Sequence, residues 1–183
     1  MTNASNGKTI AFLLTNGVEE AQLAEPRKAL EAAGAKYSIA SPSENEIQAM
    51  NHHEKGSKFK VDISLAEANP ADYDALVLPG GVANPDELRT VSKAVQFVQA
   101  FVHENKPIAA ICHGPWMLVE ADAVHGHTLT SWPSLATDIR NAGGKWIDRE
   151  VVRDGEITTS RKPSDIPAFN RAVIDAFGLS SKL

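Results

Sequence analysis

Short apolar runs alternate along this chain with longer segments in which apolar residues recur every three or four positions. Each run is too short for a helix, and a continuous apolar stretch of this length is typical of a strand buried on both faces. The strands predicted in this way are residues 9–14, 36–40, 75–78, 108–111 and 157–159.

Helices are predicted in the periodic segments between these strands, because their apolar residues fall on one helical face. The first helix is expected to end before Gly34, a residue that commonly terminates helices. The predicted helices are residues 20–33, 91–102, 116–121, 134–141 and 166–177.

Two further segments have weaker strand patterns. Phe59, Val61 and Ile63 alternate with polar residues, which predicts a half-exposed strand or hairpin arm. Another strand is expected near residues 146–152.

The alternation of strands and helices indicates a single α/β domain over residues 8–183, preceded by a polar tail at residues 1–7. We expect a mainly parallel sheet with helices on both faces. Ligands bind beyond the carboxyl ends of the strands in such folds. The loops at residues 15–20, 79–86 and 112–115 are therefore the expected site.

The composition of the 183 residues excludes several function classes. Lys and Arg total 18 and Asp and Glu total 23, giving a formal net charge of −5. This charge argues against binding of nucleic acid or anionic membranes through a basic face. No apolar run approaches the ~18 residues of a membrane span, and the first residues lack the apolar stretch of a secretory signal. With one cysteine and no export signal, a cytoplasmic protein is expected.

Cys112 carries the strongest chemical signal. It follows the strand at residues 108–111, and a His-Gly-Pro sequence suited to a sharp strand-turn-helix junction comes next. A thiol on such a turn lies at the N-terminus of the following helix, whose dipole is expected to lower the pKa of the thiol towards neutrality. His113 would act as a general base or as the cation that stabilises the thiolate. The backbone N–H groups of Gly81 and His113 would bind an oxyanion. The simpler interpretation is a small buried apolar side chain.

Other histidines and glycines do not predict a metal or dinucleotide site. His52-His53 and His125-Gly-His127 have no further ligands near them in the sequence, whereas a zinc site normally takes three or four. The Gly-Gly pairs at residues 80–81 and 143–144 do not form the G-x-G-x-x-G fingerprint. No metal and no cofactor is therefore expected.

Several short motifs are distributed from about Lys8 to Phe177. They are Gly17-Val-Glu-Glu20, Ala75-Leu-Val-Leu-Pro-Gly-Gly81, Lys106-Pro107, Ala110-Ile-Cys-His-Gly-Pro115, Asn141-Ala-Gly143, and Thr159-Ser-Arg161 with Asp165 and Pro167-Ala-Phe169. Together they resemble the DJ-1/PfpI superfamily, specifically its PfpI-like intracellular protease branch. The resemblance implies a flavodoxin-like three-layer sandwich and a homodimer or higher homo-oligomer.

The resemblance also implies roles for individual residues. Cys112 corresponds to the family nucleophile and His113 to its partner. Glu19 corresponds to the glutamate that contacts the cysteine sulfur, where a buried carboxyl would be protonated and donate a hydrogen bond.

Two further positions follow from the same resemblance. Asp86 matches an acidic residue that a neighbouring subunit contributes to a Cys-His-acid triad. The stretch before it is one residue longer than in relatives, and the acid is Asp rather than the usual Glu, so Glu87 is the alternative. Trp132 falls where relatives carry a Tyr near the pocket, and it either shapes specificity or only packs.

The sequence therefore favours a cytosolic stress-defence cysteine hydrolase in which Cys112 attacks carbonyl carbons. The resemblance implies deglycase or glyoxalase activity on methylglyoxal adducts ahead of peptidase activity, so small carbonyl compounds, glycated proteins or peptides are the expected partners. The alternative is a non-catalytic oxidative-stress sensor or chaperone that uses an oxidisable Cys112. A glutamine amidotransferase is excluded, because it requires a His-x-Glu well downstream of the cysteine and the last histidine is His127.

Overall fold

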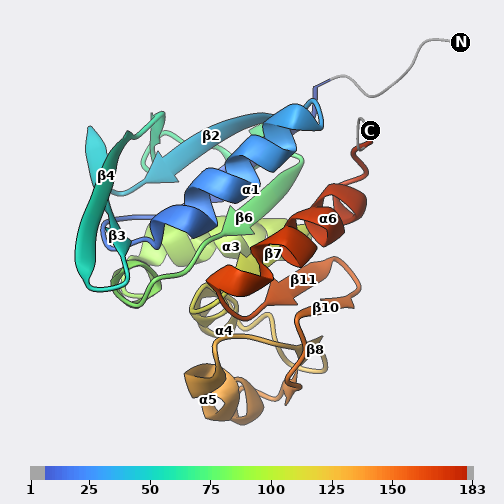
Figure 1. The fold of residues 1–183 in the computed structure, drawn as a ribbon. Helices are drawn as coiled ribbons and strands as arrows, with labels where there is room; N and C mark the ends of the chain where they lie inside the picture. Colours follow the sequence, from blue (N-terminus) through green and yellow to red (C-terminus); the bar gives the residue numbers. More distant parts are fainter. Residues whose placement is uncertain (1–6, 181–183) are drawn as a thin grey trace, which may run out of the picture.

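The computed structural model describes residues 7–180 and is built around a seven-stranded sheet with helices on both faces (Figure 1). The strand order is β10-β11-β7-β6-β1-β2-β5. All neighbouring strands pair in parallel except β10 and β11, which are antiparallel. The strands are β1 Thr9–Leu13, β2 Lys36–Ser41, β5 Ile63–Ser64, β6 Ala75–Leu78, β7 Ile108–Ile111, β10 Val151–Asp154 and β11 Ile157–Ser160. The predicted mainly parallel α/β sheet is confirmed.

Helices pack on the two faces of this sheet, α1 and α6 on one side and α3 on the other (Figure 1). The α-helices are α1 Glu20–Ala32, α2 Ala83–Leu88, α3 Ser92–His103, α4 Trp116–Glu120, α5 Ala136–Asn141 and α6 Ile166–Ala176. Short 3-10 helices occupy Pro70–Asp72, Pro133–Leu135 and Pro163–Asp165. None of the helices within residues 7–180 is long and apolar enough to cross a bilayer.

The core divides into two layers because successive side chains of a strand point to opposite faces. In β1, Phe12 packs with Phe169 of α6, whereas Leu13 packs with Phe101 of α3. All four of these side chains are fully buried. This burial on both faces is why β1, β6 and β7 have continuous apolar sequences.

Two small sheets lie outside the main one. β3 (Glu46–Asn51) and β4 (Glu54–Lys60) form an antiparallel hairpin, which projects at one end of the main sheet (Figure 1). β8 (Thr128–Leu129) and β9 (Lys145–Trp146) pair in parallel. The hairpin is the addition that matters for function, because its turn borders the candidate site.

Most predicted elements are confirmed to within two residues at each end. The first helix ends as predicted, with Gly34 at φ +89° just after its last turn. The strand predicted near residues 146–152 is wrong, because β9 and β10 are separate strands in different sheets. The hairpin arm predicted at Phe59 is confirmed, because Phe59 lies in β4 of the β3–β4 hairpin. The alternation does not continue as one strand, because β4 ends at Lys60 and Ile63 begins β5.

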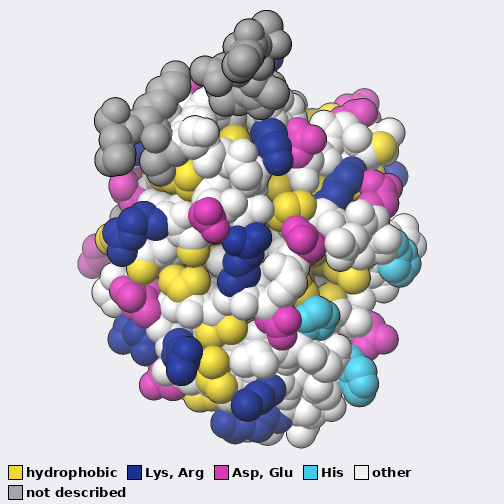
Figure 2. Space-filling model, turned by 90° about the vertical axis from the view of Figure 1, so that its right-hand side faces the viewer, with side chains coloured by type: hydrophobic (Ala, Val, Ile, Leu, Met, Phe, Trp, Pro, Cys, Tyr) yellow, Lys and Arg dark blue, Asp and Glu magenta, His cyan; other side chains and the backbone are white. Residues whose placement is uncertain are grey.

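Helix α2 was not predicted, because it has only six residues, contains Pro85 and lies where a loop was expected. The polar tail falls on residues 1–7, of which only Gly7 lies within the described residues. On the face drawn in Figure 2, basic and acidic side chains are interspersed, and neither sign forms a large patch.

Candidate active site

Cys112 lies on a sharp turn between β7 and α4, with its backbone in the left-handed region at φ +63°. This conformation is uncommon for a residue other than glycine and persists where the surrounding structure holds it. Here the Cys112 N–H donates to the Ser160 carbonyl at 3.1 Å, and the Cys112 carbonyl accepts from the Trp132 N–H at 2.9 Å. Two residues further along the same connection, position 114 requires glycine, because a Cβ on Gly114 would collide with the Leu78 carbonyl oxygen.

His113 lies beside the thiol. Its Nδ1 is 3.2 Å from the Cys112 Sγ, and both residues are buried, with 7% and 6% of their surface exposed. Burial lowers the pKa of the His113 imidazole below its ordinary value. The ring is therefore neutral at neutral pH, and its unprotonated nitrogen can accept the thiol proton.

The pKa of the Cys112 thiol is raised above its ordinary value, with burial as the largest cause. The Gln22 side chain and the Gly81 and His113 backbone amides lower this pKa, and the charge of Glu19 raises it. The expectation of a thiol pKa near neutrality is therefore wrong for this chain. The helix dipole was expected to lower it, but α4 has only five residues and the thiol is buried.

The thiol–imidazole pair lies in a pocket of about 720 Å³. The three loops expected from the strand order all contribute to its wall, and the turn of the β3–β4 hairpin closes one side. The lining residues are Gly17, Glu19, Gln22, Met50, His52, His53, Gly81, Val82, Ala83, Cys112, His113, Trp132 and Pro163.

Glu19, directly before α1, lies in this pocket and is 8% exposed. Its Oε2 accepts a hydrogen bond from the His52 N–H at 3.1 Å, and its Oε1 is 4.0 Å from the His52 Nδ1. Within residues 7–180, the side chain is thus bonded to the hairpin rather than to the sulfur. The predicted contact of Glu19 with sulfur stays a prediction.

Gly81 adopts φ +76°, and a Cβ there would collide with the Gly17 carbonyl oxygen. The close approach of these two loops brings Gly81 into the pocket of Cys112, where its backbone amide lowers the pKa of the thiol. The structure thus places Gly81 beside the thiol, where the sequence predicted an oxyanion donor.

Two buried amide side chains that sequence reasoning missed hold these loops together. Gln22 Oε1 accepts from the Gly80 N–H at 2.8 Å, and Asn84 Oδ1 accepts from the Thr15 N–H at 2.7 Å. The Asn84 Nδ2 donates to the carbonyls of Pro79 and Gly80 at 3.1 and 3.0 Å. Both side chains are fully buried. Gln22 could have been identified from the sequence as a polar residue at a helix position expected to be buried.

Trp132 stacks on the His113 ring, with ring centroids 5.8 Å apart and an interplanar angle of 24°. Trp132 is 38% exposed and Val82 is 57% exposed, so two large apolar side chains reach solvent at the mouth of the pocket. The structure therefore places Trp132 at the pocket, as the sequence predicted.

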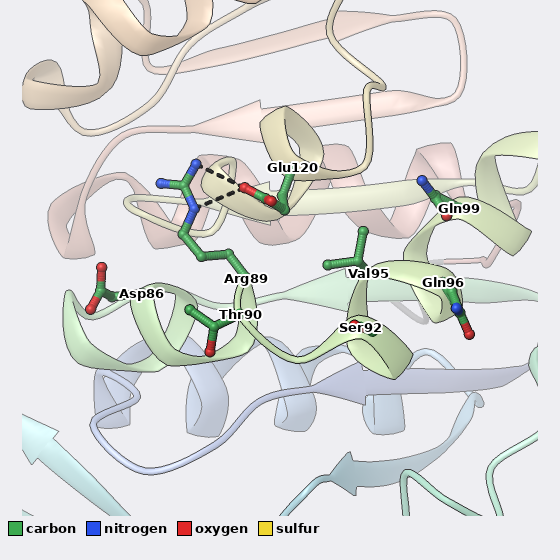
Figure 3. A pocket seen from close by; sticks show the side chains of 8 residues that line it. All are labelled: Asp86, Arg89, Thr90, Ser92, Val95, Gln96, Gln99 and Glu120. Carbon is green, nitrogen blue, oxygen red and sulfur yellow. Dashed lines mark hydrogen bonds and ion pairs between the residues drawn. The ribbon is translucent and has the colours of Figure 1, made fainter.

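Asp86 does not lie with the other predicted site residues. It is exposed on α2 and lines a separate groove of about 620 Å³ (Figure 3), and it does not line the Cys112 pocket. Glu87, the alternative acid, is also exposed on α2. A contribution from either acid to the thiol–imidazole pair therefore requires a second subunit, and it stays a prediction.

The other paired histidines form no evident metal centre. Among residues 7–180, no three side chains of His, Cys, Asp or Glu are grouped so that they could hold a metal ion.

Comparison with known proteins gives a consistent family assignment. The sequence model of the DJ-1/PfpI family matches residues 8–176. The chain is 40% identical over 166 residues to General stress protein 18 of Bacillus subtilis, covering 90% of this chain and 95% of that protein. It is 39% identical over 169 residues to an uncharacterized protein of Staphylococcus aureus strain Mu50, covering 91% and 96% of the two chains.

Solved structures show the same fold. Drosophila melanogaster DJ-1beta superposes with a TM-score of 0.84 at 27% identity, over 94% of this chain and 91% of that one. A two-domain Anabaena variabilis protein with DJ-1/ThiJ/PfpI-like and ferritin-like domains gives a TM-score of 0.87 at 31% identity. The match covers 93% of this chain but only 48% of that two-domain protein.

Proposed function

Because this chain belongs to the DJ-1/PfpI family, we propose that it is a cytoplasmic stress-defence cysteine hydrolase acting on small carbonyl compounds. Its substrates are methylglyoxal and methylglyoxal adducts of amino groups, ahead of peptides. The observation that carries the proposal is the 3.2 Å contact between Cys112 Sγ and His113 Nδ1, beside a pocket of about 720 Å³. The relative General stress protein 18 supports a role in stress.

The proposed reaction begins from a neutral thiol and a neutral imidazole. Burial raises the pKa of Cys112 and lowers the pKa of His113, so the pair at rest carries no charge. As Sγ bonds to the carbonyl carbon, His113 Nδ1 takes the thiol proton, and the carbonyl π electrons move to oxygen. With an aldehyde, return of the proton to that oxygen gives a hemithioacetal.

Release of the product requires two further proton transfers and water. In a methylglyoxal hemithioacetal, moving the proton from the former aldehyde carbon to the neighbouring carbonyl oxygen gives an enediol. Moving the hydroxyl proton of the former aldehyde to the neighbouring carbon then gives a thioester of a hydroxy acid. Water adds to the thioester, and the C–S bond breaks as the thiol regains a proton. His113 is a base in the pocket for these transfers, and no outside oxidant or reductant is needed.

The negative oxygen that forms during addition is bound by backbone donors. The Gly81 and His113 backbone amides lower the pKa of the Cys112 thiol, and both residues line the same pocket, next to the carbon that the sulfur would attack. Donors fixed in a buried site stabilise a developing oxyanion more strongly than water does. The backbone hydrogen bonds of Cys112 to Ser160 and Trp132 hold the turn that carries the His113 N–H in place.

The size of the pocket favours a small substrate. A volume of about 720 Å³ lies within the roughly 300–1,000 Å³ of typical small-molecule sites. The turn of the β3–β4 hairpin closes one side through the bond from His52 to Glu19. An extended peptide needs a longer open groove, so aldehydes and their adducts are the preferred class.

The second candidate is an oxidation sensor or chaperone, as the lone cysteine and the stress-protein relative would allow. Oxidation by peroxide follows thiolate character and exposure. Cys112 is 6% exposed and its thiol pKa is raised by burial, so slow oxidation is expected. These two observations favour the hydrolase.

The decisive experiment measures consumption of methylglyoxal, a glycated model peptide and a fluorogenic peptide by the wild type and by Cys112→Ala. We expect consumption of methylglyoxal or the glycated peptide that disappears in the variant. Wild-type rates equal to those of the variant on all three substrates would overturn the hydrolase, and a mass increase on Cys112 after peroxide would then support the sensor.

A further inference from the structure

Trp116 is fixed in place by three side chains outside the pocket. Its Nε1 donates to the Asp138 Oδ2 at 2.9 Å, and the Arg89 guanidinium lies over its ring at 5.4 Å. Arg89 is held in turn by Glu120, whose Oε2 accepts from Nε and Nη2 at 3.1 Å each (Figure 3). The indole therefore has a defined orientation although it is only half-buried.

The fixed indole packs against His113. The two ring centroids are 5.1 Å apart, with an interplanar angle of 65°. Trp132 stacks on the same imidazole at 5.8 Å and 24°. The His113 ring is thus enclosed by two indoles that meet it at different angles, which restricts its rotation.

Hydrogen bonds alone hold the imidazole weakly. Its Nε2 lies 3.5 Å from the Ser134 Oγ, at the limit of a hydrogen bond, and Ser134 is exposed. A general base is effective only when a third group orients it towards the proton it abstracts. Within this chain, aromatic packing is the contact that can supply this orientation.

We propose that Trp116 is a positioning residue for His113, which keeps Nδ1 directed at the Cys112 sulfur. The role rests on the proposed function for its place in turnover, but the geometry itself concerns only the thiol–imidazole pair. Arg89 and Asp138, on a surface remote from the pocket, act through Trp116. This role was not predicted, since Trp116 was expected only to begin a helix.

Several charged or titratable groups surround the pair. Glu19, His52 and His53 face it from the pocket, and Arg89, Glu120 and Asp138 lie beyond Trp116. A test must therefore separate the position of the ring from a change of charge. Trp116→Leu removes the ring without altering any charge, and Trp116→Phe keeps a ring but loses the bond to Asp138.

The measurement is the rate of Cys112 alkylation by iodoacetamide across a range of pH. The chain has a single cysteine, so the modified mass reports one thiol. A change in the access of iodoacetamide to Cys112 alters the alkylation rate at the high-pH plateau. Loss of the positioned base instead moves the pH midpoint of the alkylation rate. For Trp116→Leu we expect a midpoint at higher pH and a rate at pH 7 reduced about two- to tenfold, the range that an aromatic pair contributes.

Matched variants decide the outcome. Trp116→Phe should fall between Trp116→Leu and the wild type, and Asp138→Ala should show a smaller shift in the same direction. Asp138→Asn loses the same charge but keeps an acceptor for the Trp116 Nε1–H, so it should stay close to the wild type. Trp146→Phe is the control, because Trp146 does not line the pocket. If Trp116→Leu does not fold, Trp116→Phe and Asp138→Ala give the test.

The proposal would be overturned if the pH profiles of Cys112 alkylation in the Trp116 and Asp138→Ala variants matched the wild-type profile. An equal shift of the alkylation midpoint in Trp146→Phe would also overturn it. Failure of the proposed function would be a different outcome. If the wild type turned over no substrate but Trp116→Leu still shifted the alkylation midpoint, the positioning role would remain.

Discussion

Cys112 Sγ and His113 Nδ1 lie 3.2 Å apart although the residues are adjacent in sequence. Neighbouring side chains in an extended strand point to opposite faces. The left-handed backbone at Cys112, φ +63°, turns both side chains into one pocket. The turn itself thus creates the reactive pair, and its stability is a condition for activity.

The first prediction concerns the ionisation of the thiol. Burial raises the pKa of Cys112, so its alkylation by iodoacetamide should have a midpoint at higher pH than that of a cysteine in a short peptide. Mass spectrometry of samples quenched over a pH series measures both midpoints. A Cys112 midpoint below that of the peptide would show a stabilised thiolate and contradict the neutral resting pair.

Two neighbours should move the midpoint for Cys112 in opposite directions. Gln22→Leu removes a side-chain amide that lowers the pKa of the thiol, so the midpoint should rise. Glu19→Gln removes a negative charge that raises the pKa, so the midpoint should fall. Gln22→Leu should also cost about 1–3 kcal/mol of unfolding free energy, because the Gly80 N–H loses its buried acceptor. Shifts of the same sign in both variants would contradict these assignments.

The buried imidazole should make the fold sensitive to acid. Burial places the pKa of His113 in the folded state below its unfolded value of about 6.5. Between these two values the unfolded chain binds more protons, so the unfolding free energy should decrease as the pH falls below about 6.5, by at most about 1.4 kcal/mol per pH unit from this group. Urea denaturation at pH 7 and pH 5 should show a smaller decrease for His113→Gln than for the wild type. An equal decrease of the unfolding free energy in the two proteins would mean that groups other than His113 cause the acid sensitivity.

Gly81 and Gly126 form a matched pair for testing the loop contact. Both have positive φ, +76° and +77°, but a Cβ on Gly81 would collide with the Gly17 carbonyl, whereas nothing lies within 4 Å of one on Gly126. Gly126→Ala should cost about 1–2 kcal/mol, from the backbone conformation alone. Gly81→Ala should cost about 1–3 kcal/mol more and abolish turnover, because the two loops must separate. If denaturation experiments gave similar losses of unfolding free energy for Gly81→Ala and Gly126→Ala, the two loops would separate at little cost.

Asp86 tests the shared active site. If a second subunit supplies the acid of the triad, Asp86→Ala should lower kcat/KM about tenfold or more, and dilution below the oligomer dissociation range should do the same. Glu87→Ala is the control and also the test of the alternative acid. Light scattering would establish the oligomeric state of each variant. Unchanged rates for both variants and on dissociation would exclude a shared site.

Sequence patterns predicted the main sheet well because its central strands are apolar on both faces. The elements that were missed or merged are short: α2 has six residues and includes Pro85, and β9 has two. Such elements are held by tertiary contacts rather than by their own periodicity. For the same reason the sequence did not divide residues 146–152 between β9 and β10.

The site was predictable where its residues follow strands, and less so elsewhere. Cys112, Gly81 and Glu19 come from loops at the carboxyl ends of strands, so the topology brings them together. Gln22 and His52 reach the pocket only through the packing of α1 and the hairpin, which local patterns do not record. The direction of the thiol pKa depends on burial, so the position before a helix gave the wrong sign.

Within residues 7–180, the β3–β4 hairpin forms no ladder with the main sheet. It is attached to the loop before α1 and to the first residue of α1: Met50 N–H donates to the Val18 carbonyl at 2.8 Å, and Ser57 N–H donates to Glu20 Oε2 at 2.7 Å. Its turn can therefore be lengthened or exchanged without changing the register of any strand that carries the nucleophile. Related proteins can therefore differ in the β3–β4 hairpin, and so in the shape of the pocket, while the turn at Cys112 stays the same.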